Sequence, residues 1–177
     1  SYLSYHSFSE FIIYPLGCEG ENTSELGLHK LLADELSALL PNDNGNGNYK
    51  VGAPWQLLYP VDGDSMDFMH AEFGATALTF EVNEEFQPNY SIREPTLVKH
   101  RKAWRKFFEL TSQELTSIRV LDLKNPNLTA PAAIQISSIE HKHGESEFKT
   151  NAQGYFFKVL PKGAYDITAK LSDGRAA

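Results

Sequence analysis

A change in hydrophobic periodicity near residues 112–117 constrains the fold of this 177-residue chain more than any other sequence feature. Beyond it, short stretches alternate apolar and polar residues, as half-buried strands do. Turn signals such as Asn125-Pro and Gln153-Gly separate these stretches. The predicted strands are residues 118–121, 133–136, 147–150, 155–159 and 165–169. We therefore predict a small all-β sandwich over residues 115–177, following a different unit over residues 1–114.

The first unit mixes strand and helix patterns. Residues 11–14 and 74–82 are apolar and β-prone, which predicts two strands. Leucines at helical spacing predict a helix over Leu28–Leu40, with Asn22 as its N-cap, and a loop rich in Asn and Gly follows it. Pro95 is expected to open a second helix that extends to Leu115. This mixture indicates an α/β unit.

Charge and composition exclude several classes of function. The formal net charge is −7 and the pI is about 5.3, which argues against non-specific nucleic-acid binding. The basic run from Lys99 to Lys106 is expected on a solvated helix face. No apolar run approaches membrane-spanning length, so we predict no membrane span. The single cysteine, Cys18, excludes an internal disulfide framework.

A few residues carry possible chemistry. Glu81 lies between Phe80 and Val82 on an otherwise apolar strand, where an unpaired charge is costly to bury. His6 precedes a predicted strand, and Tyr59 lies in a Tyr-Pro turn. The other histidines considered as metal ligands are His70, His100 and the pair His141 and His143, and for that pair a solvated loop is the stronger interpretation. These residues alone do not define a function.

Three collinear segments resemble the zinc carboxypeptidases of the carboxypeptidase A/E type. The segment His6-Ser-Phe-Ser-Glu-Phe-Ile-Ile-Tyr-Pro-Leu-Gly17 resembles the family's HSYSQLLLYPYG-type segment. Tyr49-Lys-Val-Gly with Tyr59-Pro-Val-Asp-Gly-Asp-Ser-Met-Asp67 resembles YxxG…IYxAxGGSxDW, and Leu78-Thr-Phe-Glu-Val resembles the TFEL strand. The tail from Thr150 to Tyr165 resembles the transthyretin-like sandwich that follows the catalytic domain in the carboxypeptidase E/N/D branch.

The resemblance implies a fold and two central roles. It predicts the C-terminal half of a mixed-sheet α/β/α catalytic domain over residues 1–114 and a transthyretin-like sandwich over residues 115–177. His6 matches the family's third zinc ligand. Glu81 matches the general base and acid that activates the zinc-bound water and then protonates the leaving amine.

The resemblance also implies residues that contact a peptide or protein C-terminus. Tyr59 matches the mobile tyrosine over the substrate carboxylate, and Met66 matches the base of the pocket for the last side chain. An apolar Met66 favours apolar residues, whereas Asp64, at a position usually occupied by glycine, could attract basic ones, so the preference stays open. Ser7 and Phe8 match the stretch beyond the scissile bond. Non-proline cis peptides are expected at Ser7–Phe8, Pro15–Leu16 and Asn83–Glu84.

The family's H-x-x-E zinc motif is missing from this sequence. His29 is followed by Lys-Leu-Leu and His70 by Ala-Glu-Phe. We therefore expect the chain alone to be inactive and zinc-free, a truncated or nicked half whose partner is the missing N-terminal half. The resemblance points to a secreted or periplasmic protein, and a cytoplasmic one stays open. The alternatives are a non-catalytic binding or structural module, or a related zinc amidase or acylase acting on small or cell-wall peptides.

Overall fold

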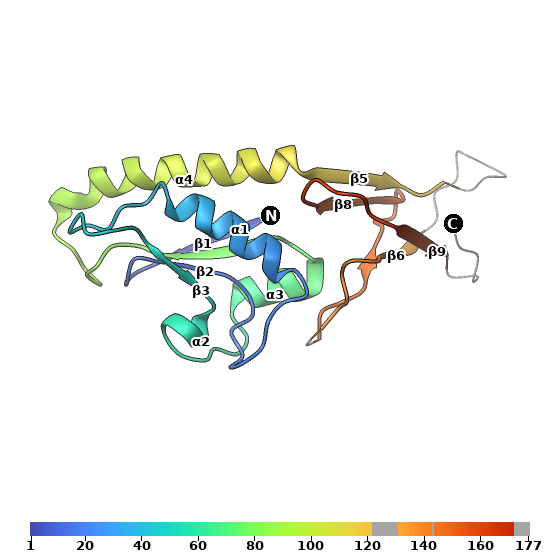
Figure 1. Cartoon of the computed structure of the whole chain (residues 1–177), viewed down its shortest axis with the longest axis horizontal. Helices are drawn as coiled ribbons and strands as arrows, with labels where there is room; N and C mark the ends of the chain where they lie inside the picture. The colour runs from blue at the N-terminus through green and yellow to red at the C-terminus, as the bar shows by residue number, and fades with distance from the viewer. Residues whose placement is uncertain (122–130, 143, 172–177) are drawn as a thin grey trace.

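A four-stranded mixed sheet organises the first part of the chain. The computed structural model describes residues 1–121, 131–142 and 144–171 (Figure 1). The strands of this sheet are β1 (Tyr2–His6), β2 (Phe11–Ile13), β3 (Lys50–Gly52) and β4 (Ala77–Glu81). Their order is β1-β4-β2-β3, with β1 parallel to β4, β2 parallel to β3, and β2 antiparallel to β4. The mixed sheet is as predicted.

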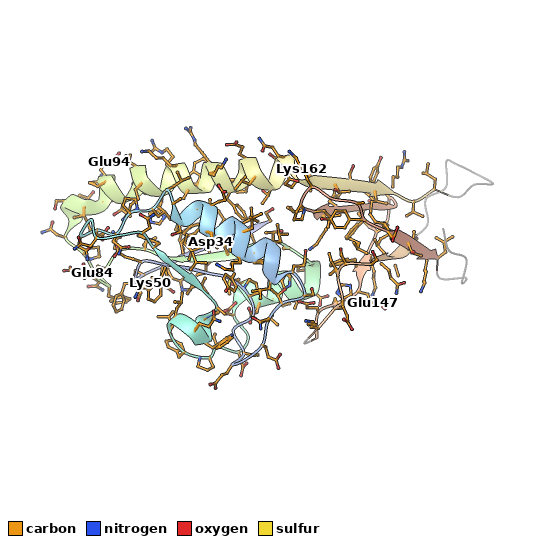
Figure 2. All side chains as sticks on the ribbon, in the orientation of Figure 1. Asp34, Lys50, Glu84, Glu94, Glu147 and Lys162 are labelled. Atoms are coloured by element: carbon orange, nitrogen blue, oxygen red, sulfur yellow. The ribbon has the colours of Figure 1, made fainter. Side chains whose placement is uncertain are left out.

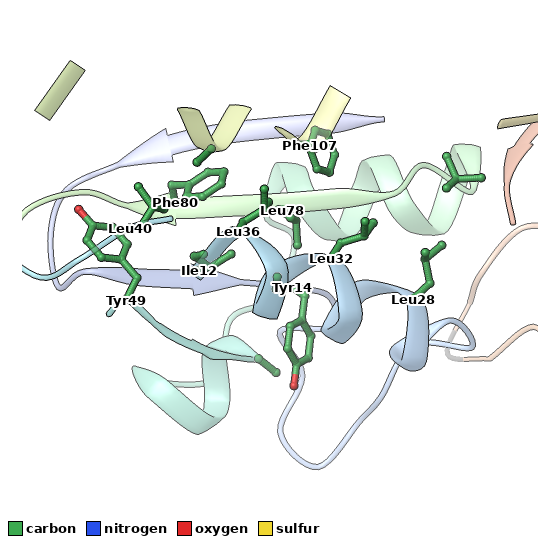
Figure 3. Packing of buried hydrophobic residues seen from close by; sticks show 14 residues of the cluster. Ile12, Tyr14, Leu28, Leu32, Leu36, Leu40, Tyr49, Leu78, Phe80 and Phe107 are labelled. Carbon is green, nitrogen blue, oxygen red and sulfur yellow. The ribbon is translucent and has the colours of Figure 1, made fainter. Parts of the chain in front are cut away.

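Helices cover both faces of this sheet. They are α1 (Leu26–Ser37), α2 (Pro54–Leu57), α3 (Ser65–Phe73) and α4 (Arg93–Gln113), with a 3₁₀ turn at Tyr90–Ile92. Ile12 packs with the leucines of α1 and with Phe107 of α4 (Figure 3). Ile13, the next residue, packs with Met66 of α3 instead. Because successive strand side chains point to opposite faces, α1 and α4 lie on one side and α3 on the other.

The two long helices begin and end differently from the sequence prediction. Asn22 does not cap α1, because the Thr23 hydroxyl accepts the Glu25 N–H and the Glu145 carboxylate accepts the Ser24 N–H, which moves the helix start to Leu26. Leu115 does not belong to α4. It begins β5 (Leu115–Arg119), where antiparallel pairing with β8 (Tyr155–Val159) replaces the helical bonds.

Two small antiparallel sheets form the second part. One contains β5 and β8, and the other has the order β7-β6-β9, with β6 at Ala132–Ile136, β7 at Phe148–Lys149 and β9 at Ile167–Leu171. Side chains from both sheets share an apolar core, in which the Phe148 and Phe156 rings meet at a tilt of 33° with centroids 5.3 Å apart. The expected turn at Asn125-Pro and the residue His143 lie outside the described residues.

Charged side chains cover the outside of the chain. Figure 2 labels acidic and basic side chains on α1, α4 and β3 of the first part and on loops of both parts. Those labelled are Asp34, Lys50, Glu84, Glu94, Glu147 and Lys162, and all are exposed. No helix in the described ranges is both long and apolar enough to cross a membrane.

Buried polar pairs join the two parts. The Lys158 ammonium on β8 donates to the Glu25 carboxylate and to the Gly74 carbonyl, and the two charged side chains are only 2% and 4% exposed. Glu145 lies 2.9 Å from His70 Nε2, and both side chains are buried. Burial raises the pKa of Glu145, but hydrogen bonds from His70 and Ser24 outweigh it and hold this pKa well below its usual range.

Removing Lys158 should be far more costly than removing an exposed lysine. Lys158→Ala leaves Glu25 buried without its counter-charge, a change that typically costs about 3–5 kcal/mol. The matched control is Lys30→Ala, which breaks an ion pair with Asp34 whose side chains are 57% and 53% exposed. Such pairs contribute at most about 0.5 kcal/mol. Urea denaturation measures the free energy of unfolding of both variants. Equal decreases would contradict a stabilising role for the buried Lys158–Glu25 pair between the two parts.

Acid should destabilise the fold below about pH 6.5 through His29. This ring is wholly buried and neutral, because burial and the adjacent His70 lower its pKa from 6.5 to about 3. The unfolded chain therefore binds more protons between those values, so stability is lost as pH falls from 6.5 towards 3, at up to about 1.4 kcal/mol per pH unit. Denaturation midpoints from pH 7.5 to 4.5 measure this slope.

The comparison variant is His29→Asn, which lowers stability but removes the titrating ring. Its stability should change less with pH than that of the natural chain. His100, whose pKa burial lowers to about 4, stays in place and contributes a remaining slope of the same sign. An unchanged slope in His29→Asn would rule out this explanation.

Candidate active site

Two neighbouring strands carry His6 and Glu81 to the same edge of the sheet. β1 and β4 run parallel, and His6 is the register partner of Glu81 at their carboxyl ends. The Val82 N–H donates to the His6 carbonyl at 2.8 Å, which continues the pairing one residue further. Side chains at matched positions of parallel strands share a face. An imidazole and a carboxylate, 75 residues apart in sequence, therefore line one site.

The environment of Glu81 suits proton transfer. The side chain is half-buried, and burial raises its pKa above the usual range, while the charge of His6 acts in the opposite direction. A carboxylate whose pKa is shifted towards neutral accepts and returns a proton more readily at physiological pH. Burial therefore gives the Glu81 carboxylate a higher affinity for a proton than an exposed glutamate has.

A pocket of about 170 Å³ lies beside this pair. Five residues predicted from the sequence line it: His6, Tyr59, Asp64, Met66 and Glu81. Met66 is 1% exposed, whereas Tyr59 is 65% exposed, so the pocket has an apolar buried wall and an aromatic ring that faces solvent. The remaining lining residues are Ile13, Pro54, Leu58, Val61, Ser65 and Thr79.

Some of these lining residues were not predicted. Thr79 lies two positions before Glu81 on β4, so the strand period of 2 places both side chains on one face. That signal was available in the sequence. Leu58 precedes the predicted Tyr59–Asp67 segment and Ser65 lies within it, but neither was predicted to line the pocket.

Asp64 and Asp67 hold the pocket wall in place. The Asp64 carboxylate accepts the Asp67 N–H at 2.7 Å and so caps α3. Asp67 accepts the Gly17 N–H at 2.8 Å, and the Gly17 carbonyl in turn accepts the Val61 N–H at 3.0 Å. Burial raises the pKa of Asp67 to about 6. The Tyr59 loop is therefore fastened to the turn after β2.

Ser7 and Phe8 follow His6 in the sequence and are not among the residues that line the pocket. The Ser7 hydroxyl donates to the Phe86 carbonyl, and the Phe8 ring meets the Phe86 ring edge-on at 6.1 Å. The peptide bonds Ser7–Phe8 and Pro15–Leu16 are cis, as the resemblance implies.

The predicted cis peptide at Asn83–Glu84 is wrong, because that bond is trans. The chain turns after β4 through a left-handed Asn83, with φ of 63°. The Asn83 side chain supports this turn by donating to Asp43 and to Thr96.

The described residues do not complete a zinc site. Across residues 1–121, 131–142 and 144–171, no three His, Cys, Asp or Glu side chains come close enough to hold a metal. His6 offers one imidazole, where a catalytic zinc takes three protein ligands. His70 and His100 are buried and bonded to Glu145 and Tyr49, and the His141 ring contacts Phe148, so the metal hypothesis for these three histidines is not supported.

The mixed sheet thus places a histidine and a glutamate at adjacent strand ends, beside a pocket with an apolar wall. The family model for zinc carboxypeptidases matches residues 1–104. This chain therefore belongs to the zinc carboxypeptidase family. A search of curated proteins finds no match.

Comparison with solved structures supports the fold. Bovine thrombin-activatable fibrinolysis inhibitor, solved in complex with tick carboxypeptidase inhibitor, matches with a TM-score of 0.55 and 24% identity. The match covers 62% of this chain and 38% of the bovine chain. The present chain thus spans well under half of that relative.

Gly17 should tolerate no side chain. An added Cβ would come within 2.4 Å of the Val61 carbonyl oxygen, so Gly17→Ala must push the Tyr59 loop away from the turn. The expected cost is about 1–3 kcal/mol. The control, Gly27→Ala on α1, meets no atom within 4 Å and should raise stability by up to about 1 kcal/mol. Thermal denaturation of both variants tests this, and a neutral Gly17→Ala would contradict the close approach.

Proposed function

We propose that the protein containing this chain is a zinc-dependent peptidase that removes residues from the C-termini of peptides. The observation that carries the proposal is the pairing of His6 and Glu81 at the carboxyl ends of β1 and β4, beside a pocket with an apolar wall. Family membership supports the reaction class. The chain spans 38% of the bovine relative, so activity is proposed for the complete protein.

In this proposal Glu81 moves the proton. It takes a proton from the water whose oxygen attacks the scissile carbonyl, and it returns that proton to the leaving nitrogen as the C–N bond breaks. The raised pKa of Glu81, caused by its burial, supports both transfers. His6 is proposed as one zinc ligand, and the other ligands would come from outside the described residues. The chain on its own is therefore proposed to be inactive.

The pocket is proposed to hold the last side chain of the substrate. Met66 forms a buried apolar wall, and Asp64 adds one carboxylate at the same pocket. This combination should accept apolar or basic C-terminal residues and disfavour acidic ones, which Asp64 repels. Tyr59, exposed beside the pocket, is proposed to close over the terminal carboxylate, with Ser7 and Phe8 beyond the scissile bond.

The second part is proposed to be a separate transthyretin-like unit, with the boundary between residues 114 and 115. Its support is the common core of two antiparallel sheets and the change from α4 to β5 at that position. The proposed partners are peptide C-termini and an N-terminal half of the catalytic domain.

Glu81→Gln in the complete protein should reduce kcat by about 10²–10⁴-fold, because an amide cannot accept the proton, while KM stays nearly constant. The substrates are peptides ending in Phe, Leu, Lys or Glu, which also measure the preference of the pocket. Glu85→Gln, an exposed carboxylate four residues further on, is the matched control and should keep full activity. Full activity of Glu81→Gln would refute the role of Glu81, and zinc-supported, Glu81-dependent turnover by this chain alone would refute its proposed inactivity.

A further inference from the structure

A cluster of charged and polar side chains, which the proposed reaction does not use, lies next to the segments that follow β1 and β4. It consists of Asp43, Asn83, Lys99 and Glu10, and we call it the Asp43 cluster. Asp43 comes from the Asn- and Gly-rich loop between α1 and β3. That loop is closed by a bridge between Pro41 and Asn48 and by the Asn42 N–H donating to the Gly47 carbonyl at 2.9 Å. Asp43 is therefore presented on a closed turn.

Asp43 holds the segment that follows Glu81. One carboxylate oxygen accepts the Asn83 side-chain amide at 3.0 Å and the Glu84 N–H at 3.2 Å. The other accepts the Lys99 ammonium at 2.7 Å. These hydrogen bonds outweigh burial and keep the pKa of Asp43 below its usual range. The carboxylate thus binds backbone and side chain directly after the strand that carries Glu81.

Asn83 is fixed from several directions. It is buried with φ of 63°, and its amide also donates to the Thr96 hydroxyl at 2.8 Å. Its backbone N–H donates to the Tyr49 hydroxyl at 3.1 Å, and Tyr49 is one of the largest buried side chains of the core (Figure 3). Its carbonyl accepts the Ser9 N–H at 2.9 Å. Ser9 lies in the segment that follows His6, so Asn83 joins the ends of β1 and β4.

Glu10 extends the cluster along the loop after β1. Its carboxylate accepts the Asp43 N–H and lies 3.9 Å from the Lys99 ammonium. Lys99 also donates to the Pro41 carbonyl at 3.0 Å, and its side chain is only 15% exposed. It does not belong to the solvated basic face predicted from the sequence. The Lys99 ammonium therefore lies between the carboxylates of Glu10, in the loop after β1, and Asp43, which binds the segment after β4.

We propose that Asp43 and Asn83 are positioning residues for the candidate active site, fastening the strand ends that carry His6 and Glu81 to each other. The effect on catalysis rests on the proposed function. The effect on the strand ends does not, because it concerns backbone contacts that exist whatever the reaction. A change of about 1 Å at reacting groups can cost about 10²-fold in rate, so such fastening has a measurable consequence.

Amide hydrogen exchange tests the fastening directly in this chain. The reporters are the Val82 N–H, bonded to the His6 carbonyl, and the Ser9 N–H, bonded to the Asn83 carbonyl. The reference is the Tyr14 N–H, bonded to the Gly52 carbonyl at the other end of β2. In Asp43→Ala, exchange at Val82 and Ser9 should accelerate at least about tenfold, with Tyr14 within about twofold of the natural chain.

Two further variants separate the side chain from the backbone. Asn83→Gly tolerates the positive φ and removes only the amide, so it should reproduce the exchange pattern of Asp43→Ala. Asp43→Asn keeps an acceptor for Asn83 and should restore part of the protection. Asp34→Ala, at an exposed ion pair on α1, is the charge-matched control and should change none of the reporters.

In the complete protein, Asp43→Ala and Asn83→Gly should lower kcat about 10–100-fold and leave KM within about threefold. Equal acceleration at Val82, Ser9 and Tyr14 would show a general loss of stability and overturn the proposal, as would no acceleration or an unchanged kcat. If Glu81→Gln keeps full activity, the proposed function fails, and the exchange pattern still decides whether Asp43 and Asn83 fasten the strand ends.

Discussion

Strand β4 is hydrogen-bonded on both sides, to β1 and to β2, and this double pairing determines the surroundings of the site. Glu81 of β4 is in register with His6 of β1 on one side and with Phe11 of β2 on the other. As in any strand, the side chains of β4 alternate between two faces, here the α1–α4 core and the α3 face. Because β4 is central, four of its five residues are buried. Glu81, at the open end, is the position where this central strand meets the pocket.

Two opposing effects act on the Glu81 carboxyl group at that end. Burial favours its neutral form, and the histidine on the adjacent strand favours the charged one. Burial is the larger effect, so the pKa of Glu81 lies above its usual range. Groups of this kind occur more often at functional sites than in structural cores.

Local patterns in the sequence were sufficient to predict much of the fold. The period of 2 beyond residue 115 identified the antiparallel strands, and the leucine spacing identified α1. The resemblance of three collinear segments to the zinc carboxypeptidases predicted one site for His6, Tyr59, Asp64, Met66 and Glu81, and all five line one pocket. The failures were at positions whose conformation depends on distant partners. Asn22 does not cap α1, because Glu145, 121 residues from Ser24 in the sequence, accepts the Ser24 N–H. The chain turns at Asn83 with a trans peptide bond, because the Asn83 side chain is held by Asp43 and Thr96.

Lysines illustrate the same limit. Lys99 lies in a basic run that was predicted to form a solvated helix face, and Lys158 lies in a predicted strand with no local sign of its burial. Each is largely buried, because its carboxylate partner is 56 or 133 residues away. A single sequence carries no local signal for such pairs, since the desolvation cost is offset only by geometry that the complete fold creates.

Two consecutive residues of β8, a strand of the second part, contact the first part of the chain through their side chains. Lys158 neutralises Glu25, and Val159 packs within the core built by α1, α4 and the mixed sheet. Excising the β-rich segment would therefore leave a buried carboxylate without a cation and a gap in an apolar interior. A hybrid that takes this segment from another protein would therefore need complementary residues on both sides to keep the charge pair and the packing.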